Sequence, residues 1–203
     1  MGTLREIFGP SKDEVWRQLA AGIGATYVDG GFWRGGKVEA KVAGWRVTLD
    51  TFTVSTGKSS ATFTRMRAPY VNPDGFRFKV YRKGVFSQIA KKLGMQDVEV
   101  GDPAFDDAFI VRGSDESRLR SLLADDEIRR LLLAQPAVYL EVRHGRRVVG
   151  PTSPRGVDEL WFQAGGVIRD LALLAALFDL FAAVLNRLCH LGSAYEDDPQ
   201  LAR

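Results

Sequence analysis

The strongest hydrophobic pattern in the chain lies between Val167 and Leu191. At 100° per residue its large apolar side chains fall on one half of a helix, and the other half carries mostly alanine and polar residues. At a rise of roughly 1.5 Å per residue the helix is about 37 Å long, so it needs a sheet or another helix along its whole length. The predicted apolar face consists of Leu171, Leu173, Leu174, Leu177, Phe178, Leu180, Phe181, Val184, Leu185, Leu188 and Leu191.

The first half of the chain combines one short helix with a period of two. Ser11 and Glu14 form a predicted capping box for the helix. Alternating apolar and polar residues from 37 to 42 then predict a strand with one solvated face. In the next strand the apolar parity changes after Leu49, which predicts a β-bulge near Asp50-Thr51.

The segment Asn72-Pro73-Asp74-Gly75 has the residues of a tight turn. It predicts that the strand Ser60–Arg67 pairs with the strand that follows the turn, at Phe76–Val80. The first half of the chain is therefore expected to form an antiparallel meander of four or five strands.

The second half contains further helices and three further strands before the long helix. A short basic helix is predicted at Val85–Leu93, and strands are predicted around Val138–Val142, Arg146–Gly150 and Leu160–Phe162. Because strands and helices are largely segregated, the fold class is α+β with a mainly antiparallel sheet. The simplest way to cover the long amphipathic helix is to place it across the concave face of that sheet, in a helix-grip-like arrangement.

We expect a single α+β domain over residues 1–203. Residues 10–94 contribute a helix, the meander and a short helix. Residues 95–191 contribute helices, strands and the long C-terminal helix, and residues 192–203 form a polar tail.

Composition places the chain among soluble globular proteins, with 45% hydrophobic and 26% charged residues. Cys189 is the only cysteine, so the sequence offers no disulfide and no cysteine-based zinc site. The first ten residues lack the apolar core of a signal peptide, and Asp179 interrupts the apolar run of the long helix. We therefore expect a cytoplasmic protein, and the Ala, Gly, Leu and Arg content favours a bacterial source.

Charge is distributed unevenly along the chain. Residues 1–100 contain 16 Lys and Arg against 9 acids, whereas residues 101–203 contain 12 against 16. This polarity favours an anionic partner for one face or head-to-tail association into a homo-oligomer.

The basic stretch from Arg65 to Lys92 contains eight Lys and Arg residues and one acid, Asp74, and it is the main candidate binding site. If its two strands pair, a clustered positive strip could bind the phosphates of an anionic lipid, whereas the alternative is a solvated sheet face. Phe63, Phe76 and Phe78 have the spacing of core positions rather than of an RNA-recognition motif, so nucleic acid is not the expected partner. The candidate anion-binding residues are Arg65, Arg67, Arg77, Lys79 and Arg82.

Three other features carry weaker functional hypotheses. Trp33, between paired glycines, could dip into a membrane interface or close over an apolar ligand, or it could fold back onto the core. Asp102, Asp106 and Asp107 could hold a divalent metal ion for a hydrolase, although loop and helix-start roles are the favoured explanation of these acids. No nucleophile elbow, P-loop or dinucleotide-binding motif is present, so no cofactor is expected.

The segments TLDTFTVSTGKSSATFTRMRAPYVNPDGFRFKVYRKGVFS and LGMQDVEVGDPAFDDAFIVRGSD, together with the ending ELWFQAGGVIRD…LNRLCHLGSAYEDDP, resemble a family of uncharacterised bacterial soluble proteins. The resemblance covers most of the chain and implies one intact domain. It implies no activity.

Together these features favour a non-catalytic binding module for an anionic or amphipathic partner, namely a lipid surface, an apolar ligand or a protein. The alternatives are a metal-dependent hydrolase that uses Asp102, Asp106 and Asp107, and a self-assembling structural subunit.

Overall fold

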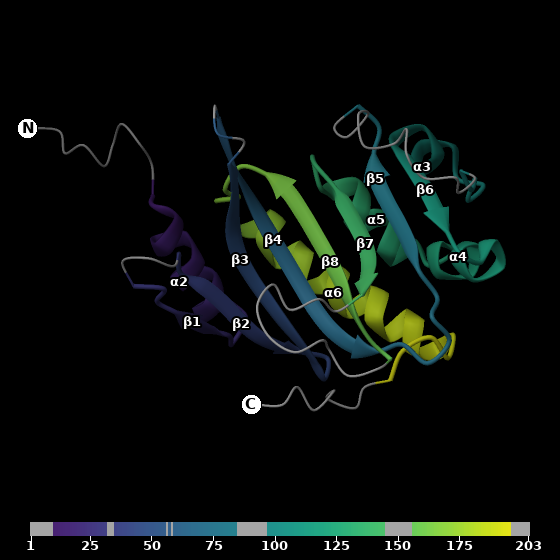
Figure 1. Ribbon diagram of the computed structural model, residues 1–203, viewed down its shortest axis with the longest axis horizontal. Coiled ribbons are helices and arrows are strands. Elements are labelled where there is room, and N and C mark those ends of the chain that lie inside the picture. The colour runs from purple at the N-terminus through teal and green to yellow at the C-terminus, as the bar shows by residue number, and fades with distance from the viewer. Residues whose placement is uncertain are drawn as a thin grey trace, which may run out of the picture.

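The computed structural model describes residues 10–31, 35–55, 57, 59–84, 97–144 and 156–195. These residues form a layer of helices against one antiparallel sheet (Figure 1). The strands are β1 (Thr26–Val28), β2 (Lys37–Val42), β3 (Trp45–Ser55), β4 (Ser60–Val71), β5 (Phe78–Arg82), β6 (Phe109–Gly113), β7 (Tyr139–His144) and β8 (Val157–Gly165). The helices are α2 (Lys12–Gly22), α3 (Pro103–Ala108), α4 (Glu116–Leu123), α5 (Asp126–Ala134) and α6 (Leu171–His190). The predicted α+β class with an antiparallel sheet is confirmed.

The eight strands of the sheet are ordered β1-β2-β3-β4-β8-β7-β5-β6. Strands β1 to β4 form the predicted meander, but β5 is not the neighbour of β4, because β8 and β7 lie between them. The predicted pairing across the Asn72–Gly75 turn is therefore wrong. The turn residues do bond locally, since the Asn72 side chain accepts from Gly75 N at 3.0 Å, but the Asn72 amide also donates to Asp158 of β8 at 2.7 Å. The chain is thus tied to the end of β8 and does not fold back as a hairpin.

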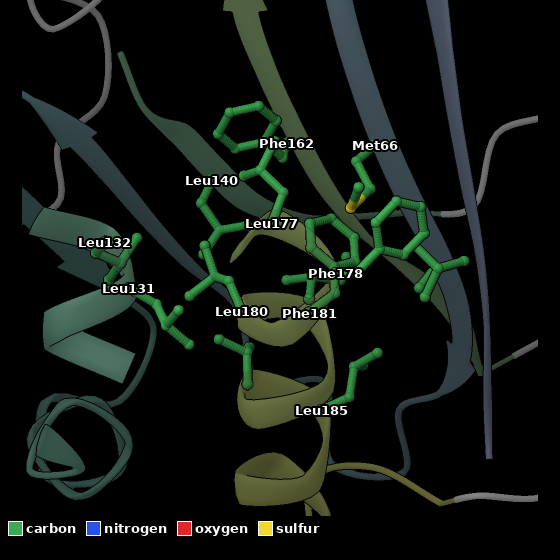
Figure 2. Close-up of a cluster of buried hydrophobic side chains, with 14 of the residues drawn as sticks. Met66, Leu131, Leu132, Leu140, Phe162, Leu177, Phe178, Leu180, Phe181 and Leu185 are labelled. Atoms are coloured by element: carbon green, nitrogen blue, oxygen red, sulfur yellow. The ribbon is translucent and has the colours of Figure 1, made fainter. Parts of the chain in front are cut away.

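Helix α6 provides the centre of the core, as its apolar pattern predicts. It begins after Asp170, whose side chain accepts from Leu173 N, rather than at Val167. Figure 2 shows Leu177, Phe178 and Phe181 directed from α6 toward the sheet, near Met66 of β4 and Phe162 of β8. Eight side chains of the predicted face are buried, namely Leu174, Leu177, Phe178, Leu180, Phe181, Val184, Leu185 and Leu188.

The other helices lie in the same layer as α6. Helix α6 contacts α2, α4 and α5, and α5 contacts α3. The predicted capping box of α2 is present, with Ser11 as the N-cap and Glu14 reaching back to it. Trp16 of α2 is fully buried, and its indole N–H donates to Ile168 O at 3.1 Å, just before α6. One face of the sheet is therefore covered along its length.

The start of the predicted polar tail also packs against the domain. Ser193 and Ala194 are buried, and Tyr195 bridges Val71 at the end of β4. Residues 196–203, like the predicted helix Val85–Leu93 and the predicted strand Arg146–Gly150, lie outside the described residues.

Within the described residues, α6 alone is long and apolar enough to cross a membrane by length and composition. The core helix of a soluble protein meets the same criterion. Because α6 buries its large side chains against the sheet, its packing is that of a core helix. Cytoplasmic localisation stays a prediction.

Candidate functional site on the outer face of the sheet

The face of the sheet opposite α6, called the outer face here, carries a row of polar and aromatic side chains. Figure 1 views this face, with α6 behind the strands. The register places Arg67 of β4 opposite Trp161 of β8, Trp161 opposite Glu141 of β7, and Glu141 opposite Lys79 of β5. No helix of the described residues crosses this face. Such cross-strand neighbours lie close enough to interact directly.

Trp161 is the centre of the row. The Arg143 guanidinium lies 4.0 Å from its ring centroid and the Arg65 guanidinium lies 5.0 Å from it. Phe52 packs edge-on at 6.1 Å, and the indole N–H donates to Gln163 at 3.2 Å. The ring therefore fixes two arginine heads on the outer face through cation–π contacts.

Asp50 is the carboxylate partner of two arginines on β4. It accepts from Arg65 Nε at 2.6 Å and Nη2 at 2.5 Å, which is a bidentate pair. Arg67 Nη2 approaches the same carboxylate at 3.2 Å. Since Asp50 is largely buried and shared by two cations, the pair Arg65–Asp50 is a structural ion pair, and Arg67 is only partly neutralised.

Glu141 is the second buried carboxylate of the outer face. It forms ion pairs with Lys79, at 2.9 Å, and with Arg143. It also accepts from the Tyr139 hydroxyl at 3.2 Å. Burial lowers the pKa of Lys79, but the hydrogen bond and charge of Glu141 exceed that effect, so the pKa of Lys79 is raised overall.

Two polar groups at the centre of this face have no hydrogen-bond partner among the described residues. The Arg67 Nε is buried and donates to none of them, although the Arg67 side chain as a whole is 36% exposed. Glu159 of β8 makes no hydrogen bond or ion pair to a described residue, and burial raises the pKa of its carboxyl against the opposing effect of Arg67, Arg65 and Arg143. A buried N–H without an acceptor and an acid without an ion pair to a described residue therefore lie on neighbouring strands.

An aromatic patch adjoins the charged row. Phe52 and Phe63 are opposite one another on β3 and β4 and stack at 5.2 Å, and Val54 beyond them is 46% exposed.

The β-bulge predicted near Asp50-Thr51 is wrong, because β3 pairs with β4 without interruption from Thr48 to Ser55. The alternation of apolar and polar residues changes after Leu49 because the aromatic side chain of Phe52 lies on the outer face. The core position predicted for Phe63 is wrong for the same reason.

The structure brings together only part of the predicted anion-binding set. Arg65, Arg67 and Lys79 share the outer face. Arg82 points to the helix layer, where it donates to Leu133 O and Gln135 O at the end of α5. Arg77 lies in the segment before β5, and Trp33 lies outside the described residues.

Two of the three predicted metal-site acids, Asp102 and Asp106, serve local backbone geometry. Asp102 is the N-cap of α3, and Asp106 accepts from Val100 N and Gly101 N at 2.9 Å. Asp107 is exposed. The described residues include no group of three or more His, Cys, Asp or Glu that could hold a metal ion.

A second polar cluster lies at the other face, at the ends of β7 and β8. Asp158 is buried and contacts His144 Nδ1 at 3.0 Å, Asn72 at 2.7 Å and Arg77 Nε at 3.3 Å. Arg77 Nη2 lies 2.9 Å from His144 Nδ1 and 2.7 Å from Nε2. Both ring nitrogens of His144 are therefore within hydrogen-bond distance of partners in this cluster. This cluster anchors the chain where it leaves β4.

Sequence reasoning missed Asp50, Glu141, Arg143, Glu159 and Trp161 as members of the outer face. The alternation in Glu159-Leu160-Trp161-Phe162-Gln163 contained a usable signal, because it places Trp161 on the polar side of a strand. The neighbours of that strand, however, depend on the strand order.

The chain matches no known protein family, no curated protein and no solved structure. The function must therefore be inferred from the residues themselves.

Proposed function

We propose that the protein is a binding module whose outer face takes a peptide segment of a partner protein, with an acidic side chain of that segment next to an apolar one. The observation that supports this most strongly is Arg67, whose side chain is 36% exposed and only partly neutralised by Asp50, on the same face as the aromatic patch of Phe52, Phe63 and Val54. The proposal keeps the expected anionic and amphipathic partner and narrows it to a protein.

The composition of the outer face supports a protein partner. Protein interfaces are enriched in Trp, Tyr, Phe and Arg, and their strongest contributions come from aromatic and arginine side chains near the centre. Here two arginines are already fixed against Trp161 by the fold. Fixed side chains lose less conformational entropy when a partner binds.

The charge balance argues against a polyanionic surface as the partner. The cations Arg65, Arg67, Arg143 and Lys79 share their face with three acids, namely Asp50, Glu141 and Glu159. A membrane or nucleic acid presents many phosphates at once and would meet these acids, whereas a single carboxylate can be placed at Arg67.

Selection of a random peptide library on the immobilised protein tests the proposal. Wild-type protein is expected to enrich peptides that carry Asp or Glu beside an aromatic or aliphatic residue. Arg67→Gln should remove the preference for the acid, and Val54→Asp should weaken the preference for the apolar residue. Arg130→Gln is the matched control, because Arg130 is an exposed arginine of α5 paired with Glu127.

Two results would contradict the proposal. One is enrichment of peptides that lack this combination or that do not respond to Arg67→Gln. The other is cosedimentation with phosphatidylserine vesicles, but not phosphatidylcholine vesicles, that Arg67→Gln abolishes while no peptide motif emerges. The second result would point to a lipid surface.

A further inference from the structure

We propose that Arg67 and Arg143 form an anion subsite and that the ionised carboxylate of Glu159, which lies between them, competes with an external anion there. An external carboxylate or sulfate therefore binds best when Glu159 is neutral. This inference rests on the proposed function, since it concerns the site that would take the acidic side chain of a partner.

The register places Glu159 between the two arginines. Glu159 is directly opposite Arg143 of β7, and on its other side it is opposite Pro69 of β4, two residues from Arg67. Direct and diagonal cross-strand neighbours are both within reach of long side chains. Pro69 offers no side-chain donor, and Arg67 and Arg143 are, with Arg65, the cations of these two strands whose charges act on the Glu159 carboxylate.

Both arginines retain hydrogen-bonding capacity. A guanidinium has five N–H donors. Among the described residues, Arg67 uses one nitrogen on Asp50 and Arg143 uses one on Glu141. The Arg67 Nε has no acceptor among the described residues, but it is buried. An anion would therefore meet the two guanidinium groups through their exposed parts, since the Arg67 and Arg143 side chains are 36% and 35% exposed.

Glu159 opposes such an anion as long as it is ionised. Its carboxylate makes no hydrogen bond or ion pair to a described residue, and burial raises its pKa despite the nearby arginines. The other charged groups that face it are Arg65 of β4 and Asp50 of β3, with Glu141 of β7 beyond Arg143. Asp50 and Glu141 are held by ion pairs, so Glu159 is the acid of this group that protonates without breaking one.

Titration with sodium sulfate provides the test, because sulfate keeps both charges between about pH 5 and about pH 7.5. The full-length protein is followed by NMR through the indole N–H of Trp161, assigned with Trp161→Phe. The sulfate dissociation constant is expected to fall as the pH is lowered through the raised pKa of Glu159, on the order of tenfold once Glu159 is fully neutral, since one repulsive charge is then removed at close range. Glu159→Gln should bind at the higher pH as tightly as wild type does at the lower pH, and with little pH dependence.

Two variants make the result specific. Arg67→Gln should abolish sulfate binding at both pH values. His144→Gln should leave the pH dependence unchanged, because His144 lies on the opposite face and contacts Asp158 rather than this site.

Each contrary result has a distinct meaning. Sulfate binding that depends on Arg67 but is equal at both pH values and unaffected by Glu159→Gln would overturn the competitor role and leave the anion site of the proposed function intact. No sulfate binding in wild type or Glu159→Gln at either pH would overturn the subsite itself. The peptide selection described above would then decide separately whether the outer face binds a partner by its aromatic patch.

Discussion

The guanidinium of Arg143 lies 4.0 Å from the ring centroid of Trp161, across the pair of strands β7 and β8. Arg65 reaches the same ring from β4 at 5.0 Å. Two arginines from strands far apart in the sequence are thus held by one aromatic side chain. The outer face is therefore a prearranged surface rather than a set of independent solvated charges.

Replacing Trp161 tests how far its ring holds this surface together. Cation–π contacts contribute about 0.5–1 kcal/mol each at partly exposed sites, so Trp161→Leu should destabilise the domain by roughly 1–2 kcal/mol. Trp161→Phe keeps an aromatic ring and loses the hydrogen bond to Gln163, and it should cost less. Urea unfolding measures both variants, and equal losses would show that the ring face contributes nothing.

Asp50→Asn should be one of the most destabilising substitutions on the sheet. It removes the charge that pairs with both Arg65 and Arg67, and the Arg65 and Asp50 side chains are only 15% and 12% exposed. Breaking a buried pair from one side typically costs about 3–5 kcal/mol, because the partner charge is left without compensation. Thermal unfolding checks this value.

The double variant Asp50→Asn/Arg65→Leu controls for that interpretation. It also removes the Arg65 charge that Asp50→Asn leaves without a partner, so it should recover part of the stability lost in Asp50→Asn. If the double variant is as unstable as the sum of two single variants, Asp50 and Arg65 act independently and the ion pair is not the cause.

Phe181→Ala should destabilise the domain by about 3–5 kcal/mol, because Phe181 is fully buried between α6 and the sheet. Ala172→Ser on the exposed side of the same helix is the matched control. It should leave the midpoint of urea unfolding nearly unchanged. Similar effects of the two substitutions would contradict the packing of α6.

The parts of the fold that depend on local pattern could be predicted from the sequence. The buried face of α6 follows from spacing alone, and the capping box of α2 follows from Ser11 and Glu14. The strand order could not be predicted, because turn chemistry at Asn72–Gly75 is compatible with a hairpin as well as with a crossover. The choice depends on contacts with Asp158 and Ser114, which come much later in the chain.

In the candidate site, too, only the relationships between residues of one strand could be predicted from the sequence. Arg65 and Arg67 could be assigned to one face because they alternate on one strand. Trp161, Glu141 and Arg143 join them only because β8 and β7 are inserted between β4 and β5. The positive charge of the basic stretch is also local to the sequence, whereas the acids that neutralise it, Asp50 and Glu141, come from other strands.

Glu159→Gln should stabilise the protein near neutral pH. The pKa of Glu159 is raised above its usual value of 4.5 in the folded state, chiefly by burial. Between the unfolded and folded pKa values the folded protein binds more protons than the unfolded chain, so the wild-type free energy of unfolding falls as pH rises through this interval. Because glutamine cannot ionise, the free energy of unfolding of Glu159→Gln does not include this decrease.

The difference in melting temperature between Glu159→Gln and wild type should therefore be small at about pH 4, grow as pH rises through the raised pKa, and stay constant above it. Calorimetry of both proteins over the same pH series measures this difference, and all other titrating groups cancel because both proteins contain them. Glu127→Gln is a control of opposite sign, since the Arg130 side chain lowers the pKa of Glu127 on exposed α5. If the melting temperature of Glu159→Gln follows that of wild type at every pH, the carboxylate is solvated or paired. Burial would then not raise the pKa of Glu159, and the prediction would be wrong.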